Sequence, residues 1–73
     1  MNKNIIILFE NLAKDIEFRE NFSKHTELDP LYQFCISVSG GYSLIEFEEF
    51  LKTINSIDSL IPDKILKSGF IHS

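Results

Sequence analysis

The sequence is poor in the residues that build covalent or metal-held scaffolds. Cys35 is the single cysteine, so no disulfide can form within the chain. No group of Cys and His residues has the spacing of metal ligands. These absences exclude a disulfide-stabilised scaffold and a zinc module, and we expect neither a metal nor another cofactor.

Basic residues and long apolar runs are also scarce. Seven Lys and Arg against eleven Asp and Glu give a net charge of -4, which repels phosphate backbones and anionic lipid headgroups. The longest apolar run, residues 5–9, ends at Glu10 and is far too short to span a bilayer. No small-residue cleavage site follows it. We therefore expect no nucleic-acid or membrane partner, no secretory signal, and a location in the cytoplasm.

What the chain does contain is typical of a small folded domain. Of its 73 residues, 44% are hydrophobic and 25% charged, which argues against disorder. A chain of this length buries only about 60% of the surface that it exposes when unfolded. One domain with a modest core is therefore predicted.

Apolar residues at helical spacing predict two helices in the first third of the chain. The first covers residues 4–14, with Asn4 as its N-cap and Ile16 continuing its stripe. The second covers about residues 16–24, with Asp15 as a hinge or cap between the two. The inner faces are Ile5, Leu8, Phe9 and Leu12 in the first helix, and Phe18 and Phe22 in the second.

Asp29 and Pro30 predict the start of a third helix, with Asp29 as the cap and proline at the first helical position. This helix should end at Ser39-Gly40-Gly41, because glycine readily adopts the backbone conformation that terminates helices. Its predicted inner face is Leu31, Phe34, Cys35 and Val38.

The most strongly specified stretch is residues 40–51, a turn followed by a helix start. Ser43 and Glu46 have capping-box spacing, and Tyr42 and Phe47 are placed for a hydrophobic staple. The fourth helix, about residues 44–55, should bury Phe47, Phe50, Leu51 and Ile54. Exposed ion pairs are predicted at i,i+4 spacing for Glu10 with Lys14, Glu20 with Lys24 and Glu48 with Lys52.

These segments predict an all-α fold, a small bundle of three to five short helices. The helical domain should cover residues 1–55. Residues 56–73 form a short tail, in which residues 62–67 could add one or two helical turns packed on the bundle.

Candidates for chemistry are few, and each has a structural explanation that we favour. Cys35 is the only possible thiol nucleophile and His25 the nearest base, but Cys35 lies on an apolar stripe and is interpreted as core. The carboxylates of Glu46, Glu48 and Glu49 are interpreted as a solvated face. We therefore expect no enzyme activity.

Two short strings resemble known sequence signals. Asp58-Ser59-Leu60 resembles the tripeptide around the phosphopantetheine-bearing serine of acyl carrier proteins, which we interpret as coincidence. Gly40-Gly41 could be a double-glycine processing site, but it is interpreted as a helix stop because the capping box follows directly. Whether it is ever cleaved is left open.

Some apolar residues fall outside the inner faces at 100° per residue. They are Ile7, Tyr32, Ile36 and Ile45. Scattered exposed apolar residues are normal, yet this number in so small a domain is a candidate partner surface.

A family pattern also emerges. It consists of residues 8–15 (LFENLAKD), then Phe18-Arg19 and Phe22, and finally Gly41-Tyr42 followed by residues 46–51 (EFEEFL). In these residues the chain resembles the Nif-eleven-type leader-peptide family, over about residues 5–54. The resemblance implies a helical bundle against which a peptide-modifying enzyme docks, with a core peptide behind it. Residues 56–73 contain no Cys or Thr, the residues such cores commonly supply, so whether this tail is a core or structure stays open.

The sequence therefore indicates two functions from different classes. The first is a non-catalytic, leader-like helical binding domain that a peptide-modifying or processing enzyme recognises through Ile7, Tyr32, Ile36 and Ile45. The alternative is a small acidic inhibitor or decoy from a mobile element, which blocks a basic site on a larger protein through Glu46, Glu48 and Glu49. Self-association is left open in both.

Overall fold

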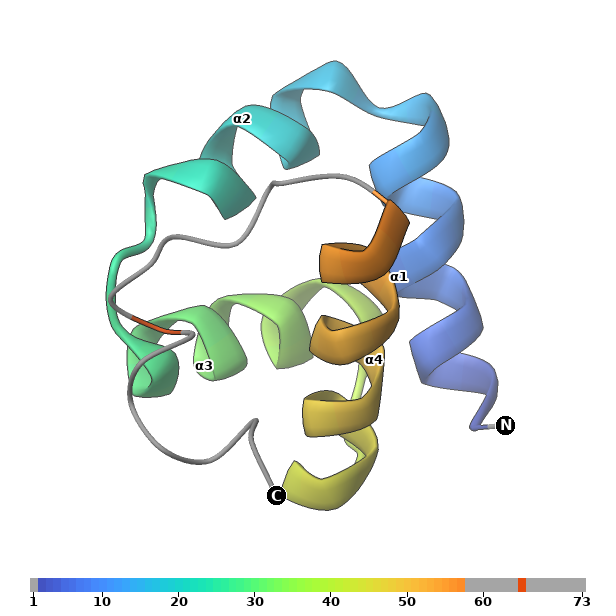
Figure 1. The fold of residues 1–73 in the computed structure, drawn as a ribbon. Helices are drawn as coiled ribbons and strands as arrows, with labels where there is room; N and C mark the ends of the chain where they lie inside the picture. Colours follow the sequence, from blue (N-terminus) through green and yellow to red (C-terminus); the bar gives the residue numbers. More distant parts are fainter. Residues whose placement is uncertain (1, 58–64, 66–73) are drawn as a thin grey trace.

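The computed structural model describes residues 2–57 and Ile65. In this part of the chain four helices follow one another: α1 (Lys3–Lys14), α2 (Ile16–Lys24), α3 (Leu28–Ser39) and α4 (Leu44–Ile57) (Figure 1). No residue of the described part lies in a strand. The predicted all-α fold is confirmed.

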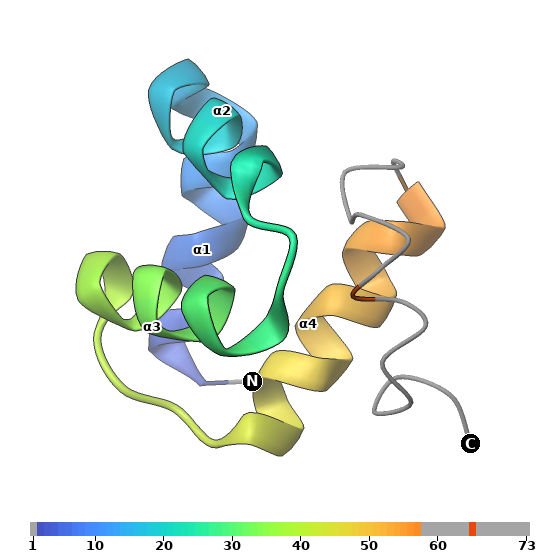
Figure 2. The ribbon, with the colours of Figure 1, turned by 90° about the vertical axis from the view of Figure 1, so that its left-hand side faces the viewer.

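Helix α1 is the central element, because it contacts each of the other helices. Helix α2 continues from α1 after a bend, α3 lies across the lower part of the bundle, and α4 stands beside α1 (Figures 1 and 2). The inner faces meet in one core. Its buried members are Ile5, Leu8, Leu12, Phe18, Phe22, Leu31, Cys35, Tyr42, Phe47, Phe50, Leu51, Ile54 and Ile65.

The bend between α1 and α2 is made by a single residue. Asp15 ends α1, and its carboxylate accepts a hydrogen bond from the backbone N–H of Phe18 at 3.1 Å. The predicted hinge and cap are therefore confirmed. Ile16, however, is 70% exposed and does not continue the α1 stripe, because the break at Asp15 changes the direction of the helix axis.

The start of α1 differs from the prediction. Asn2, and not Asn4, is the N-cap, and its side chain accepts a hydrogen bond from the Asn4 N–H at 2.8 Å. The Asn4 side chain instead donates to the carbonyl oxygen of Gly41 at 2.7 Å. This bond ties the start of α1 to the turn between α3 and α4.

Helix α3 begins earlier than predicted and presents a different face. Glu27 is its N-cap, without a side-chain capping bond, so the prediction for Asp29 was wrong. Pro30 still lies in the first turn, where a missing N–H leaves no intrahelical bond unmade. The buried residues are Leu31, Cys35 and Ser39, whereas Val38 is 43% exposed. The helix is rotated toward Tyr32, which packs against the aromatic residues of the staple.

The turn between α3 and α4 matches its sequence signals. Gly40 ends α3 with a φ of 99° and a ψ of 177°, so its φ is positive as expected for a glycine stop, while its ψ leads into extended chain. The rings of Tyr42 and Phe47 stack at 5.7 Å, which confirms the staple. All the core residues predicted for α4 are buried, and the helix continues to Ile57, beyond the expected end at Asn55.

Of the predicted ion pairs, Glu10 and Lys14 form one at 3.8 Å. Within residues 2–57 the other predicted pairs are not formed, in keeping with the small net gain of exposed pairs. Most of the predicted tail, including Asp58-Ser59-Leu60 and the possible turns at 62–67, lies outside the described residues. Ile65 is the exception, and it is buried in the core.

Candidate functional site

The predicted apolar partner residues divide into two groups. Ile7 on α1 and Ile45 in the first turn of α4 are exposed, by 39% and 69%. Tyr32 and Ile36 are half-buried and pack against the core. The prediction of exposure therefore holds for the first pair and was wrong for the second, because α3 is rotated relative to its expected inner face.

Tyr32 has a structural role at the α3–α4 turn. Its ring lies 5.6 Å from that of Tyr42 and 5.2 Å from that of Phe47. Its hydroxyl donates a hydrogen bond to the carbonyl oxygen of Tyr42 at 2.7 Å. Tyr32 thus stabilises the turn that positions α4.

The predicted acidic residues do not form one continuous surface. The capping box is confirmed: the Glu46 N–H donates to the Ser43 hydroxyl at 3.1 Å, and the Ser43 N–H donates to Glu46 Oε1 at 3.0 Å. Asn2 Nδ2 also donates to this oxygen, at 3.5 Å. The hydrogen bond from the Ser43 backbone lowers the pKa of Glu46, so this carboxylate is ionised at neutral pH.

Cys35 and His25 are not joined as a catalytic pair. Cys35 is fully buried, and burial raises the pKa of its thiol to about 12. His25 stacks on Phe34 at 4.9 Å, and its Nδ1 lies 2.7 Å from the carbonyl oxygen of Asn21. No hydrogen bond in the described part of the chain links the two side chains. A buried neutral thiol is a poor nucleophile.

Beside Cys35 lies the hydroxyl of Tyr42, which is buried and has no hydrogen-bond partner of standard geometry among the described residues. Burial raises the pKa of Tyr42, and the neighbouring Cys35 raises it further. The nearby Ser39 hydroxyl donates to the Cys35 carbonyl oxygen at 3.0 Å. These polar groups are enclosed by the core and offer no access to a substrate.

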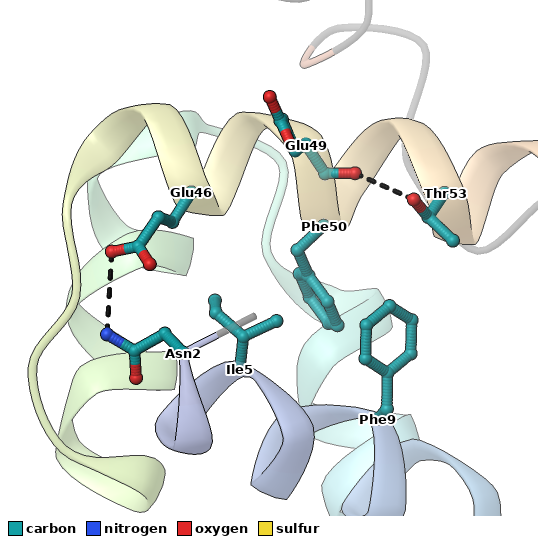
Figure 3. A pocket seen from close by; sticks show the side chains of 7 residues that line it. All are labelled: Asn2, Ile5, Phe9, Glu46, Glu49, Phe50 and Thr53. Carbon is teal, nitrogen blue, oxygen red and sulfur yellow. Dashed lines mark hydrogen bonds between the residues drawn. The ribbon is translucent and has the colours of Figure 1, made fainter.

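A pocket of about 330 Å³ opens between α1 and α4. Its lining residues are Asn2, Ile5, Phe9, Glu46, Glu49, Phe50 and Thr53. Figure 3 shows Phe9 and Phe50 meeting at its centre and Glu46 reaching toward Asn2 at one end; the two rings lie 4.9 Å apart, edge to face. We call this feature the α1–α4 groove.

Residues of the groove were predicted to lie on separate faces and not in one site. Ile5, Phe9 and Phe50 were assigned to inner faces, and Glu46 and Glu49 to an acidic surface. Glu48 does not line the groove. Helical spacing places residues on a face of their own helix, but it does not show that α1 and α4 stand side by side.

Residues 2–57 and Ile65 contain neither a membrane-spanning helix nor a metal-binding cluster. None of the helices there is long and apolar enough to cross a membrane. Over the same residues, no group of three or more His, Cys, Asp and Glu side chains could hold a metal ion. The exposed apolar residues and the α1–α4 groove are the candidate binding features of this part of the chain.

Comparisons with known proteins add no functional assignment. No family model, no curated protein and no solved structure matches this chain.

Proposed function

We propose that this chain is a non-catalytic, leader-like helical binding domain that a peptide-modifying or processing enzyme recognises in the cytoplasm. The observation that carries the proposal is the exposure of Ile45 and Ile7 on helices whose inner faces are already filled by core residues. Exposing such side chains has no folding benefit, whereas an apolar groove on a partner would bury them.

The leader-like part of the proposal has its support in the sequence pattern. Leu8 and Leu12, and then Phe18 and Phe22, carry the first half of the resemblance, and all four are core residues of α1 and α2. The Gly41-Tyr42 turn and the helix after it carry the second half. A bundle of this kind is what the resemblance implies for a docking domain.

The surroundings of Cys35 and Glu46 favour a non-catalytic role for these two side chains. Cys35 is buried with a raised pKa, and Glu46 is occupied by the capping box. An ordinary helical binding module needs neither group for chemistry.

The test is binding of the purified chain to a purified peptide-modifying or processing enzyme. Ile45→Ala is compared with Ile16→Ala, since these positions are exposed by 69% and 70%. If Ile45 lies in the interface, its truncation should weaken binding at least about fivefold, the effect of about 1 kcal/mol. Ile16→Ala should bind as the unaltered chain does. Equal affinities for the two variants, or no binding by any of the proteins, would contradict the proposal.

A second candidate is the acidic inhibitor. The observation that favours it is that Glu46, with its lowered pKa, and the exposed Glu49 line the same side of α4. An acidic inhibitor of a basic site should lose affinity steeply as salt rises, whereas contacts through Ile45 and Ile7 should not. The salt dependence of the same binding measurement separates the two functions.

A further inference from the structure

The α1–α4 groove has an apolar floor and an acidic rim. Ile5 and Phe50 are buried beneath it, and the half-buried ring of Phe9 packs edge to face on Phe50. Glu46 and Glu49 supply the charge, and none of the seven lining residues, all of them in the described part of the chain, is basic. The groove therefore combines burial of an apolar side chain with attraction of a neighbouring cation.

The charge on the rim is held in place at one end. Glu46 Oε1 accepts hydrogen bonds from the N–H and hydroxyl of Ser43 and from the Asn2 amide. No hydrogen bond among residues 2–57 uses the other carboxylate oxygen. That oxygen can accept a hydrogen bond from a cationic side chain while the capping box stays intact.

The size and surroundings of the groove favour a peptide over a small cofactor. Its volume of about 330 Å³ is at the lower end of ligand pockets, which span about 300–1,000 Å³. Exposed apolar side chains adjoin the groove: Ile6 flanks it on α1, between Asn2 and Phe9, and Ile57 extends it on α4 by one turn beyond Thr53. An extended apolar strip suits a peptide segment that places one side chain in the pocket and lies along the flanks.

From this arrangement we infer that the α1–α4 groove binds a peptide segment in which a large apolar side chain is flanked by Lys or Arg. The apolar side chain packs on Phe9 and Phe50, and the cation pairs with Glu46 and Glu49. This binding is separate from recognition through Ile7 and Ile45, since neither residue lines the groove. The full chain would then receive a basic segment on one surface while it presents exposed isoleucines on others.

The experiment uses fluorescence anisotropy with a short labelled helical peptide that carries Phe and Leu one turn apart and lysines at neighbouring positions. A second probe has the same apolar residues with glutamate in place of each lysine. The lysine probe should bind saturably, and its affinity should fall as salt rises. The glutamate probe should bind at least about tenfold more weakly, because like charges at an interface are strongly unfavourable.

Matched variants of α4 locate the binding. Thr53→Arg puts a long cationic side chain into the groove and should weaken binding of the lysine probe at least about tenfold, through steric block and repulsion. Asn55→Arg makes the same addition at an exposed position on the opposite side of α4, and its affinity should match that of the unaltered chain. Circular dichroism confirms that both variants keep their helix content.

A second pair of variants tests the charge on the rim of the groove. Glu49→Gln should weaken binding of the lysine probe about two- to fivefold, which is the effect of losing one exposed charge pair. Glu20→Gln on α2, an equal change of net charge away from the groove, should change nothing.

The following outcomes would overturn the inference. Equal binding by Thr53→Arg and Asn55→Arg would place the probe elsewhere, and equal binding of the two probes would remove the charge requirement. No saturable binding would also contradict it. If sedimentation shows that the chain self-associates and that Thr53→Arg alone abolishes this, a second copy is the occupant. Ile45→Ala, by contrast, should bind the lysine probe as the unaltered chain does, so a failure of the proposed function is told apart from a failure of this inference.

Discussion

At the scale of single residues, Gly40 has a constrained backbone conformation. It has a φ of 99°, and it is the only residue of the described part with a positive φ. A Cβ added there would lie 3.0 Å from Nδ2 of Asn4, the atom that bonds to the Gly41 carbonyl oxygen. The backbone conformation therefore favours glycine at this position, and an added Cβ would also make the Asn4 side chain shift by a few tenths of an ångström.

Gly40→Ala should destabilise the fold by about 1–2 kcal/mol, because an L side chain at this φ is strained and the contact with Asn4 must shift. Gly41→Ala is the matched control. A Cβ at Gly41 has no neighbour within 4 Å, and the change should lie within about 0.5 kcal/mol. Urea unfolding followed by circular dichroism measures both. Equal free energies of unfolding would show that Gly40 is not under conformational constraint.

At the scale of the helices, their ends are set mainly by side chains that are close in sequence. Asp15 caps α2 by bonding to Phe18, and Ser43 and Glu46 bond to each other at the start of α4. Such bonds satisfy N–H groups that have no partner within the helix. The Glu46 bonds also link folding to pH, because they favour the ionised carboxylate.

Glu46→Gln should reduce the loss of stability in acid. The pKa of Glu46 is lowered from 4.5 in the folded state, so the unfolded chain takes up the proton first as pH falls. The contribution of Glu46 is therefore complete above about pH 4.5, and it is lost as the pH drops through the folded pKa. Glutamine keeps the capping-box geometry without this titration.

Urea unfolding at pH 7 and at pH 3 tests this prediction. The decrease in the free energy of unfolding between these values should be smaller for Glu46→Gln than for the unaltered chain. The control is Glu20→Gln, which removes one charge from the exposed part of α2 and should show the full decrease. An identical acid response for the two variants would mean that the capping carboxylate does not couple folding to pH.

At the scale of the whole molecule, the core includes a residue from beyond α4. Ile65 is 1% exposed and belongs to the same cluster as the inner faces of α1 to α4. Ile65 lies in the tail expected for residues 56–73, so at this position the tail contributes to the core. A small domain gains much from each added buried side chain, because its buried fraction is limited.

Ile65→Ala should destabilise the protein by about 2–5 kcal/mol, through lost apolar burial and the cavity left behind. This is a large part of the total stability of so small a domain. Ile57→Ala is the matched control, since Ile57 is 74% exposed, and its effect should lie within about 0.5 kcal/mol. Thermal and urea unfolding measure both. A cost for Ile65→Ala no larger than that for Ile57→Ala would show that the tail does not stabilise the core.

Local signals in the sequence were reliable wherever residues a few positions apart decide the structure. The hinge at Asp15, the stop at Gly40, the capping box and the staple were all predicted, together with the inner faces of α1, α2 and α4. Each depends on hydrogen bonds or contacts within one or two turns of chain. The predicted cap at Asn4 was wrong because Asn2 competes for that role, and nothing local decides between them.

Only the tertiary structure decided how these helices face one another. The sequence by itself determined four amphipathic helices, their approximate ends and an acidic net charge, since spacing and capping act within a segment. It did not determine the rotation of α3, because Val38 and Tyr32 flank opposite sides of the same apolar stripe. The packing of Tyr32 on Tyr42 and Phe47 selects the Tyr32 side. The α1–α4 groove likewise exists only because distant helices pack side by side and bring Phe9 beside Phe50.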